Sequence, residues 1–364
     1  MLWEMELQES LINVENIKTQ FGTSINEINR VKEKYPMRLP NYYYEVVKKN
    51  ADGCLIKTCI PNILELEDQG EVDTSGEKES YVMTGVQHKY DNTVLLLTTN
   101  ECAMYCRYCF RKRMVGSSTN EIVTRINQAC EYIECHSEVD NVLLSGGDSF
   151  MLNTKTIENY LKRLCAIDHL SYIRFGTKIP VVFPQRIIND GKLVEILRKY
   201  GQKKQIYVIT QFNHPDEITK EAQESIHILR YEGVIVRNQS VLLRGVNDSI
   251  NVLCELLKKL VSIGVIPYYI FQCRPVKGAQ NMFQVSMNRG YEIIEQAKKK
   301  LSGLEKNFKF ICSTPAGKVE ILGLYNNRLI LKFHEARERN MQGKIFFQDL
   351  NTEGSWINWG VNIL

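Results

Sequence analysis

Short apolar runs alternate with amphipathic stretches from Thr93 onward. Apolar runs of this length, rich in Val, Ile and Leu, predict buried strands, and a 3.6-residue apolar period between them predicts helices. The predicted strands cover 93–99, 141–145, 171–176, 205–210, 234–241 and 266–272, and the predicted helices cover 121–135, 154–165, 190–200, 216–231 and 249–263. Six strands alternating with helices indicate an α/β fold, a partial (β/α)6 barrel whose chemistry lies at the carboxyl ends of its strands.

The two ends of the chain have other patterns. Residues 25–35 read as a helix that Pro36 and Pro40 end, and a second helix restarts after them. The acidic, polar, glycine-bearing stretch 67–80 predicts an exposed loop. After residue 304, three apolar runs predict a β-rich segment. We therefore expect a helical extension over 1–92, the barrel over 93–304 and a C-terminal β-rich segment over 305–364.

Composition narrows the function classes. The 364 residues are 44% apolar and 24% charged, with a formal net charge of +4, which is too weak and too dispersed to indicate nucleic-acid binding. No apolar run reaches the ~18 residues of a membrane span, and the first residues carry acids where a secretion signal has basic residues. Eleven cysteines without a disulfide framework are typical of reduced thiols. The expected location is the cytoplasm.

Three of these cysteines lie within eight residues. The stretch E-C-A-M-Y-C-R-Y-C-F-R-K-R (101–113) places Cys102, Cys106 and Cys109 beside four basic residues. Thiolates are the usual ligands of iron–sulfur centres, and three of them leave one iron of a 4Fe–4S cluster open to another ligand. Zinc is a weaker interpretation because a structural zinc site needs four protein ligands, and ordinary buried thiols are a third.

The cysteine loop closely resembles that of radical S-adenosylmethionine (SAM) enzymes, specifically the lysine 2,3-aminomutase family. The resemblance extends over about residues 40–330. It implies that L-L-S-G-G-D (143–148) binds the SAM amino group through Gly146, Gly147 and Asp148, although G-G-D alone would only indicate a turn. Further similar runs, at 210–219 and 238–248, imply that His214 and Gln239 line the SAM pocket.

The resemblance also implies pyridoxal 5′-phosphate (PLP), carried by Lys318 in S-T-P-A-G-K-V-E. A lysine amine forms a Schiff base when its surroundings lower its pKa. This turn is about two residues shorter than in the family, and an ordinary exposed lysine is the alternative. Lys89 and Tyr90 match the basic and aromatic positions that grip PLP in the family. Thr93 stands where the lysine enzymes usually have a second arginine, which implies a thinner grip on the phosphate.

Substrate residues depart from those of the lysine enzymes. Arg111 matches the family arginine that holds the α-carboxylate, but Arg274 replaces an acid that receives the distal ammonium of lysine. The second acid aligns with Ser313, or with Ile311 in an ungapped alignment. Like charges in a dry site cost several kcal/mol, so lysine should be a poor substrate. The pattern resembles glutamate 2,3-aminomutases, unless Arg274 pairs with an acid of the N-terminal extension instead.

The resemblance predicts no zinc, because Ser249 follows G-V-N-D where the family has a cysteine, and no cysteine follows Cys312. Expected partners are a small amino-acid substrate and an electron donor such as flavodoxin or ferredoxin; a homo-oligomer is compatible with the sequence. Three alternatives stay open. They are a radical SAM enzyme without PLP (a dehydrogenase, epimerase or peptide-modifying enzyme), lysine 2,3-aminomutase itself, and a non-catalytic iron–sulfur or zinc scaffold.

Overall fold

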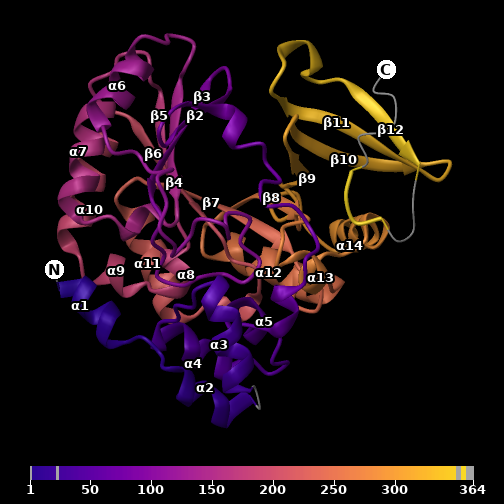
Figure 1. The fold of residues 1–364 in the computed structure, drawn as a ribbon. Coiled ribbons are helices and arrows are strands. Elements are labelled where there is room, and N and C mark those ends of the chain that lie inside the picture. The colour runs from indigo at the N-terminus through magenta and orange to yellow at the C-terminus, as the bar shows by residue number, and fades with distance from the viewer. Residues whose placement is uncertain (1, 22–23, 350–353, 358–364) are drawn as a thin grey trace.

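One continuous sheet organises the computed structural model, which describes residues 2–21, 24–349 and 354–357 (Figure 1). Its strands follow one another in chain order from β1 to β12. Neighbours from β3 to β9 are parallel, and neighbours at both ends are antiparallel. The strands are β1 (Tyr81–Met83), β2 (Val86–Tyr90), β3 (Thr93–Thr99), β4 (Asn141–Gly146), β5 (Tyr172–Gly176), β6 (Gln205–Thr210), β7 (Ile235–Leu242), β8 (Ile266–Gln272), β9 (Lys309–Thr314), β10 (Gly317–Tyr325), β11 (Arg328–Ala336) and β12 (Ile345–Asp349).

Helices connect successive parallel strands and confirm the predicted partial (β/α)6 barrel. The principal crossover helices are α6 (Ile126–Glu134), α7 (Thr154–Leu164), α10 (Gly191–Gly201), α11 (Lys220–Tyr231), α12 (Ile250–Ser262) and α14 (Met287–Lys299), with the short helices α8 (Ile179–Val182), α9 (Gln185–Ile188) and α13 (Gln280–Phe283) beside them. In the described part of the chain, no helix combines the length and apolar character needed to cross a membrane.

Two details differ from the predicted elements. Strand β9, expected in the C-terminal segment, pairs in parallel with β8 and extends the barrel sheet by one strand. Helix α6 begins later than the predicted residue 121, because the backbone N–H of Val123 donates to the carbonyl of Leu97 on β3 at 2.8 Å. A loop that hydrogen-bonds to β3 therefore takes residues that the apolar period assigned to a helix.

Alternation along the strands separates the core from the barrel interior. In β7, Val236, Asn238 and Ser240 are buried on the helix side, whereas Gln239 and Val241 are partly exposed and line an internal cavity. This period of two follows from the pleat of a strand. Consequently, polar side chains such as Gln239 can face the interior without breaking the apolar core beneath the helices.

Five helices form most of the N-terminal extension at one end of the barrel (Figure 1). They are α1 (Leu2–Glu9), α2 (Val14–Phe21), α3 (Ile25–Lys34), α4 (Asn41–Lys49) and α5 (Ile56–Cys59). Helices α3 and α4 confirm the predicted pair on either side of Pro36 and Pro40. The three-part division of the chain stays a prediction. Strands β1 and β2 lie within 1–92 but join the barrel sheet.

The exposed loop predicted over 67–80 is wrong for its second half. Thr74, Ser75 and Glu77 are buried, at 2%, 8% and 4% exposure. Glu77 is held inside by ion pairs to Arg111 and Arg113, each at 2.8 Å. The polar composition predicted solvent exposure. Glu77 is instead buried because it forms ion pairs with arginines of the cysteine loop.

A fully buried carboxylate joins the extension to the same loop. Glu65 lies in the 3₁₀-helix η1 (Ile63–Leu66), with Arg107 at 2.5 Å and Lys112 at 2.6 Å. Burial alone would raise the pKa of Glu65, but the charges of Lys112 and Arg107 hold it below its ordinary value. The guanidinium of Arg107 also donates to the carbonyl of Pro36 at 2.8 Å. One acid thus fixes the position of two cations of the loop.

Substitution of Glu65 by Gln should destabilise the fold by about 3–5 kcal/mol, because it leaves Arg107 and Lys112 buried without a countercharge. Denaturant titration of the purified protein measures this change. The control is Glu45→Gln, which breaks a partly exposed pair with Lys48 and should cost less than about 1 kcal/mol. Equal losses of unfolding free energy in the two variants would show that the buried ion pairs of Glu65 stabilise the fold no more than an exposed pair does.

Candidate active site

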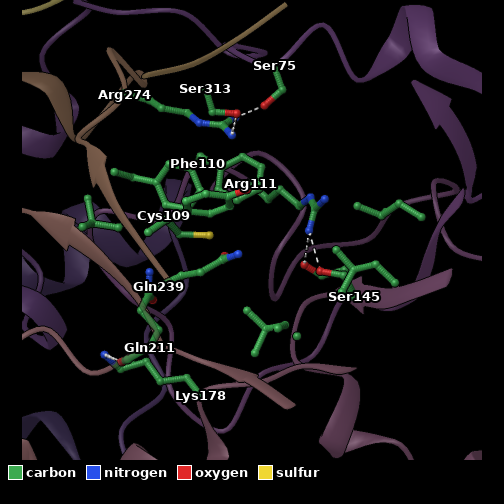
Figure 2. Close-up of a pocket in the computed structure, with 18 of the residues that line it drawn as sticks. Ser75, Cys109, Phe110, Arg111, Ser145, Lys178, Gln211, Gln239, Arg274 and Ser313 are labelled. Atoms are coloured by element: carbon green, nitrogen blue, oxygen red, sulfur yellow. Dashed lines mark hydrogen bonds between the residues drawn. The ribbon is translucent and has the colours of Figure 1, made fainter. Parts of the chain in front are cut away.

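A cavity of about 360 Å³ opens inside the curve of the sheet (Figure 2). Its walls come from the cysteine loop after β3, the turn after β4, the interior faces of β5 to β8, and the C-terminal strands. Of the residues that the sequence predicted for the site, these line it: Cys102, Cys106, Cys109, Gly146, Gly147, Asp148, Gln239, Lys89, Tyr90, Lys318, Arg111, Arg274 and Ser313.

The three cysteines suit an iron–sulfur cluster better than a single metal ion. All three thiols are free and reach the same cavity. Within the described residues, no three His, Cys, Asp or Glu side chains gather closely enough for one ion. Burial raises the pKa of Cys109 to about 11, so these thiols need a bound metal to become thiolates. In a cubane each cysteine binds a different iron, which suits separated sulfurs.

The glycines after β4 bring its end against the cysteine loop. Gly146 has φ +119°, and a Cβ there would lie 2.2 Å from the Thr99 carbonyl oxygen. A Cβ on Gly147 would lie 2.3 Å from the carbonyl oxygen of Glu101. The resemblance implied that these glycines help to bind the SAM amino group. In the structure, the closest approach is between two backbone segments, and both glycines still line the cavity.

Asp148 is a buried carboxylate at the wall beside the cysteines. Its oxygens accept from the backbone N–H groups of Phe150 at 3.0 Å and Lys178 at 2.6 Å. Burial raises its pKa to about 6, and these hydrogen bonds oppose the rise. Each carboxylate oxygen has a further lone pair, so Asp148 can also accept from an ammonium. Its predicted role toward SAM stays a prediction.

The structure differs from the expectation for His214, which lies outside the cavity lining. It is 4% exposed, and its Nδ1 accepts from the backbone N–H of Asp216 at 3.2 Å, capping the 3₁₀-helix η4 (Pro215–Glu217). Lys178 faces the cavity instead. Its Nζ donates to Glu217 and to the hydroxyl of Tyr108, each at 3.1 Å. The run 210–219 therefore contributes through Thr210 and Gln211, which line the cavity, and through the buried acid Glu217, which pairs with Lys178.

Arg274 follows β8 and reaches across the top of the cavity. It donates to the hydroxyls of Ser75 and of Ser313, the latter at 2.7 Å, and its guanidinium lies 4.1 Å from the centre of the Phe110 ring (Figure 2). Burial lowers its pKa to about 10, which leaves it charged at neutral pH. Among the described residues, no carboxylate forms an ion pair with Arg274, but the charges of Glu77 and Asp73 in the extension oppose the lowering of its pKa, so the alternative of an acidic partner from the extension stays a prediction.

Arg111 also lies in the wall, but it already has a carboxylate partner. Its Nε donates to Glu77 at 2.8 Å, and its Nη1 donates to the hydroxyl of Ser145 at 3.0 Å (Figure 2). Burial alone would raise the pKa of Glu77, but the charges and hydrogen bonds of Arg111 and Arg113 lower it to about 2. A substrate carboxylate would therefore share Arg111 with Glu77. The predicted role of Arg111 stays a prediction.

Lys318 lies on β10 and faces the cavity, not the solvent. Its Nζ forms an ion pair with Glu335 and lies 4.4 Å from the centre of the Tyr90 ring. Burial lowers the pKa of Lys318, against the opposing charge of Glu335. Lys89 is a second buried amine in the same cavity, with a pKa lowered to about 7 by burial and by the charges of Arg274 and Lys318. Both amines meet the electrostatic requirement for carbonyl chemistry.

Sequence reasoning missed several polar groups of the lining. They are Ser75, Glu77, Arg174, Lys178 and Glu335. Glu335 had a local signal, since alternation along 328–336 places this acid on the same strand face as Leu331 and Phe333. The register shift between Lys318 and Val319, which no local pattern encodes, pairs Lys318 directly with Glu335.

Comparisons with known proteins agree with this geometry. A family model described as a 4Fe-4S single cluster domain matches residues 91–171. L-lysine 2,3-aminomutase of Fusobacterium nucleatum subsp. nucleatum is 38% identical, covering 86% of this chain and 74% of that protein. The enzyme of that name from Clostridium subterminale is 37% identical, with coverages of 83% and 73%. Glutamate 2,3-aminomutase of Clostridioides difficile is 34% identical, with coverages of 83% and 72%.

A three-cysteine loop at the carboxyl edge of a partial barrel, supported by the 4Fe-4S match, is that of a radical SAM enzyme. The sequence identity of this chain to the three relatives above defines its family more specifically than the cysteine loop does. The chain belongs to the lysine 2,3-aminomutase family, which includes glutamate 2,3-aminomutase. It is an isomerase of the aminomutase type, with a 4Fe–4S cluster and SAM as cofactors.

Replacing Asp148 by Asn should weaken SAM binding by about tenfold or more, because the ammonium loses a charge-assisted acceptor. Equilibrium dialysis of the anaerobically reconstituted protein measures the affinity. Asn keeps an acceptor for the Phe150 N–H, and the iron content should stay unchanged. Loss of iron with unchanged SAM affinity would mean that Asp148 supports the loop and does not meet SAM.

Proposed function

We propose that this enzyme is a PLP-dependent 2,3-aminomutase of an amino acid whose side chain carries a carboxylate, with glutamate as the first candidate. The reaction would move the α-amino group to the β-carbon. One observation carries the choice of substrate. Arg274 is a partly buried cation that faces the cavity, and its hydrogen-bond partners among the described residues are the hydroxyls of Ser75 and Ser313.

The surroundings of Arg274 favour an anionic ligand. Its two serine partners are neutral and hold two N–H groups, and the aromatic ring of Phe110 covers one face of the guanidinium. The remaining donors can bind a carboxylate, whereas an ammonium would meet a like charge in a site of low dielectric. Lysine is the competing substrate, since it is the one named for the relative with 38% identity.

The chain's own residues would divide the work as follows. Arg274 would bind the side-chain carboxylate, while Arg111 would bind the α-carboxylate beside Glu77. Glu335 can accept a proton from Lys318 Nζ, because the two groups are already paired. When bound, the cluster with SAM supplies the radical chemistry, and PLP supplies a carbonyl for the amino group. The cavity walls hold these groups together and exclude water.

Replacement of Arg274 by Asp should lower kcat/KM for glutamate by about 100-fold or more, because a buried substrate carboxylate would then lack a countercharge. Arg274→Lys keeps the charge but loses the paired geometry, so its loss should be smaller. Conversion of glutamate and lysine is measured under anaerobic conditions by chromatography and mass spectrometry.

The formation of 5′-deoxyadenosine without amino-acid product serves as the control for folding and cluster loading. Arg274→Asp should retain it. A wild-type preference for lysine would remove the carboxylate substrate from the proposal. Equal loss for both amino acids in Arg274→Asp, with 5′-deoxyadenosine retained, would assign Arg274 a structural role.

Lys318 should carry the cofactor. Reduction of the PLP-loaded protein with borohydride, followed by peptide mass spectrometry, should find a pyridoxyl group on Lys318. Lys318→Ala should lack it. Lys89 is the internal competitor, since its pKa of about 7 also makes it a reactive amine in the same cavity. A pyridoxyl group on Lys89 alone would transfer the role to that residue, and its absence from both would exclude PLP.

A further inference from the structure

Arg174 on β5 is a cavity cation that forms no ion pair with a carboxylate among the described residues. Its Nη2 donates to the side-chain oxygens of Asn141 and Thr93, the latter at 3.5 Å, and both partners are neutral. Its Nε is buried and has no hydrogen-bond partner among the described residues. A buried guanidinium N–H left without an acceptor is costly unless a ligand completes it.

Each of the other cations of the cavity has either a carboxylate partner or neutral oxygen acceptors among the described residues. Arg111 has Glu77, Lys178 has Glu217, and Lys318 has Glu335. Lys89 donates to two backbone carbonyls, and Arg274 donates to two hydroxyls. In this set, Arg174 combines the lack of a carboxylate ion pair with a buried N–H that lacks any acceptor. That combination indicates a place for an anion.

Arg174 lies within electrostatic reach of the PLP lysine. Its charge contributes to lowering the pKa of Lys318 and that of Glu335, and all three residues line one cavity. Its partner Thr93 begins the strand that pairs with β2 at Tyr90, and the Tyr90 ring lies against Lys318 Nζ. The aldehyde and the phosphate of PLP lie on different substituents of one ring. An amine and a phosphate-binding cation must therefore share a cavity without touching each other.

We infer that Arg174 binds the phosphate of PLP, an inference that rests on the proposed PLP dependence. A planar guanidinium offers paired donors to a phosphate, and the dianion supplies the ion pair that Arg174 lacks. Thr93 then has a positioning role, because its hydroxyl accepts from the same guanidinium.

The test compares PLP with pyridoxal, which has the same aldehyde but no phosphate. Equilibrium dialysis of the cluster-loaded protein gives both dissociation constants for wild type, Arg174→Gln and Arg174→Lys. Arg174→Gln should bind PLP at least about tenfold more weakly and leave the affinity for pyridoxal within about twofold, because only the phosphate contact is lost. Arg174→Lys should recover part of the PLP affinity. Inorganic phosphate should compete with PLP in wild type and less so in Arg174→Gln.

Arg237→Gln is the matched control. Arg237 also comes from the barrel interior, but it lies over the rings of Tyr207 and Tyr268, at 5.7 and 4.9 Å, outside the cavity lining. Its ratio of PLP to pyridoxal affinity should equal that of wild type. A ratio that is unchanged in Arg174→Gln, or that falls only in Arg237→Gln, would overturn the inference. Failure of the wild type to bind PLP would instead overturn the proposed PLP dependence.

Discussion

Two buried carboxylates determine the shape of the cysteine loop. Arg107 and Lys112 both meet Glu65, and Arg111 and Arg113 both meet Glu77. A loop with this many cations would repel itself if it were folded around three thiols without countercharges. The two acids come from the segment before the barrel, so that segment is a structural part of the site. The same contacts join residues 65–77 to the carboxyl edge of the sheet.

The two ends of the cavity differ in how their cations are paired. Near the loop, acids and bases are matched, because Arg107 and Lys112 pair with Glu65 and Arg111 and Arg113 pair with Glu77. Toward Arg274 and Arg174, cations meet hydroxyls and amides. Ion pairs fix the positions of their side chains, whereas a cation with only neutral partners can still bind an anionic ligand. This division is the basis of the proposal that the end of the cavity near Arg274 and Arg174 binds anionic groups.

The sequence predicted the elements much better than the contacts between them. Apolar period and length were sufficient to predict the parallel strands β3 to β8 and the main helices between them, but not the place of β9 or helix α14. Cysteine spacing was sufficient to locate the cysteine loop. Glu65 and Glu77 could not be found this way, because they act 42 and 34 residues from their arginine partners. The absence of a cation at Thr93 was visible in the sequence, but the guanidinium that faces it comes from 81 residues further along. His214 lay in a run similar to the family, yet its backbone cap turns it away from the cavity.

Strand β9 joins the barrel sheet on one side and the Lys318 hairpin on the other. Because Ser313, Lys318 and Glu335 complete the wall, the cavity has no closed form until residue 335 has folded into place. During synthesis, the cysteine loop, the turn after β4 and the strands through β8 all emerge earlier. Until β9 to β11 have been synthesised, the nascent barrel lacks the wall of the cavity that these strands provide. The order of the strands along the chain thus sets the order in which the parts of the site are synthesised, and Lys318 and then Glu335 come last.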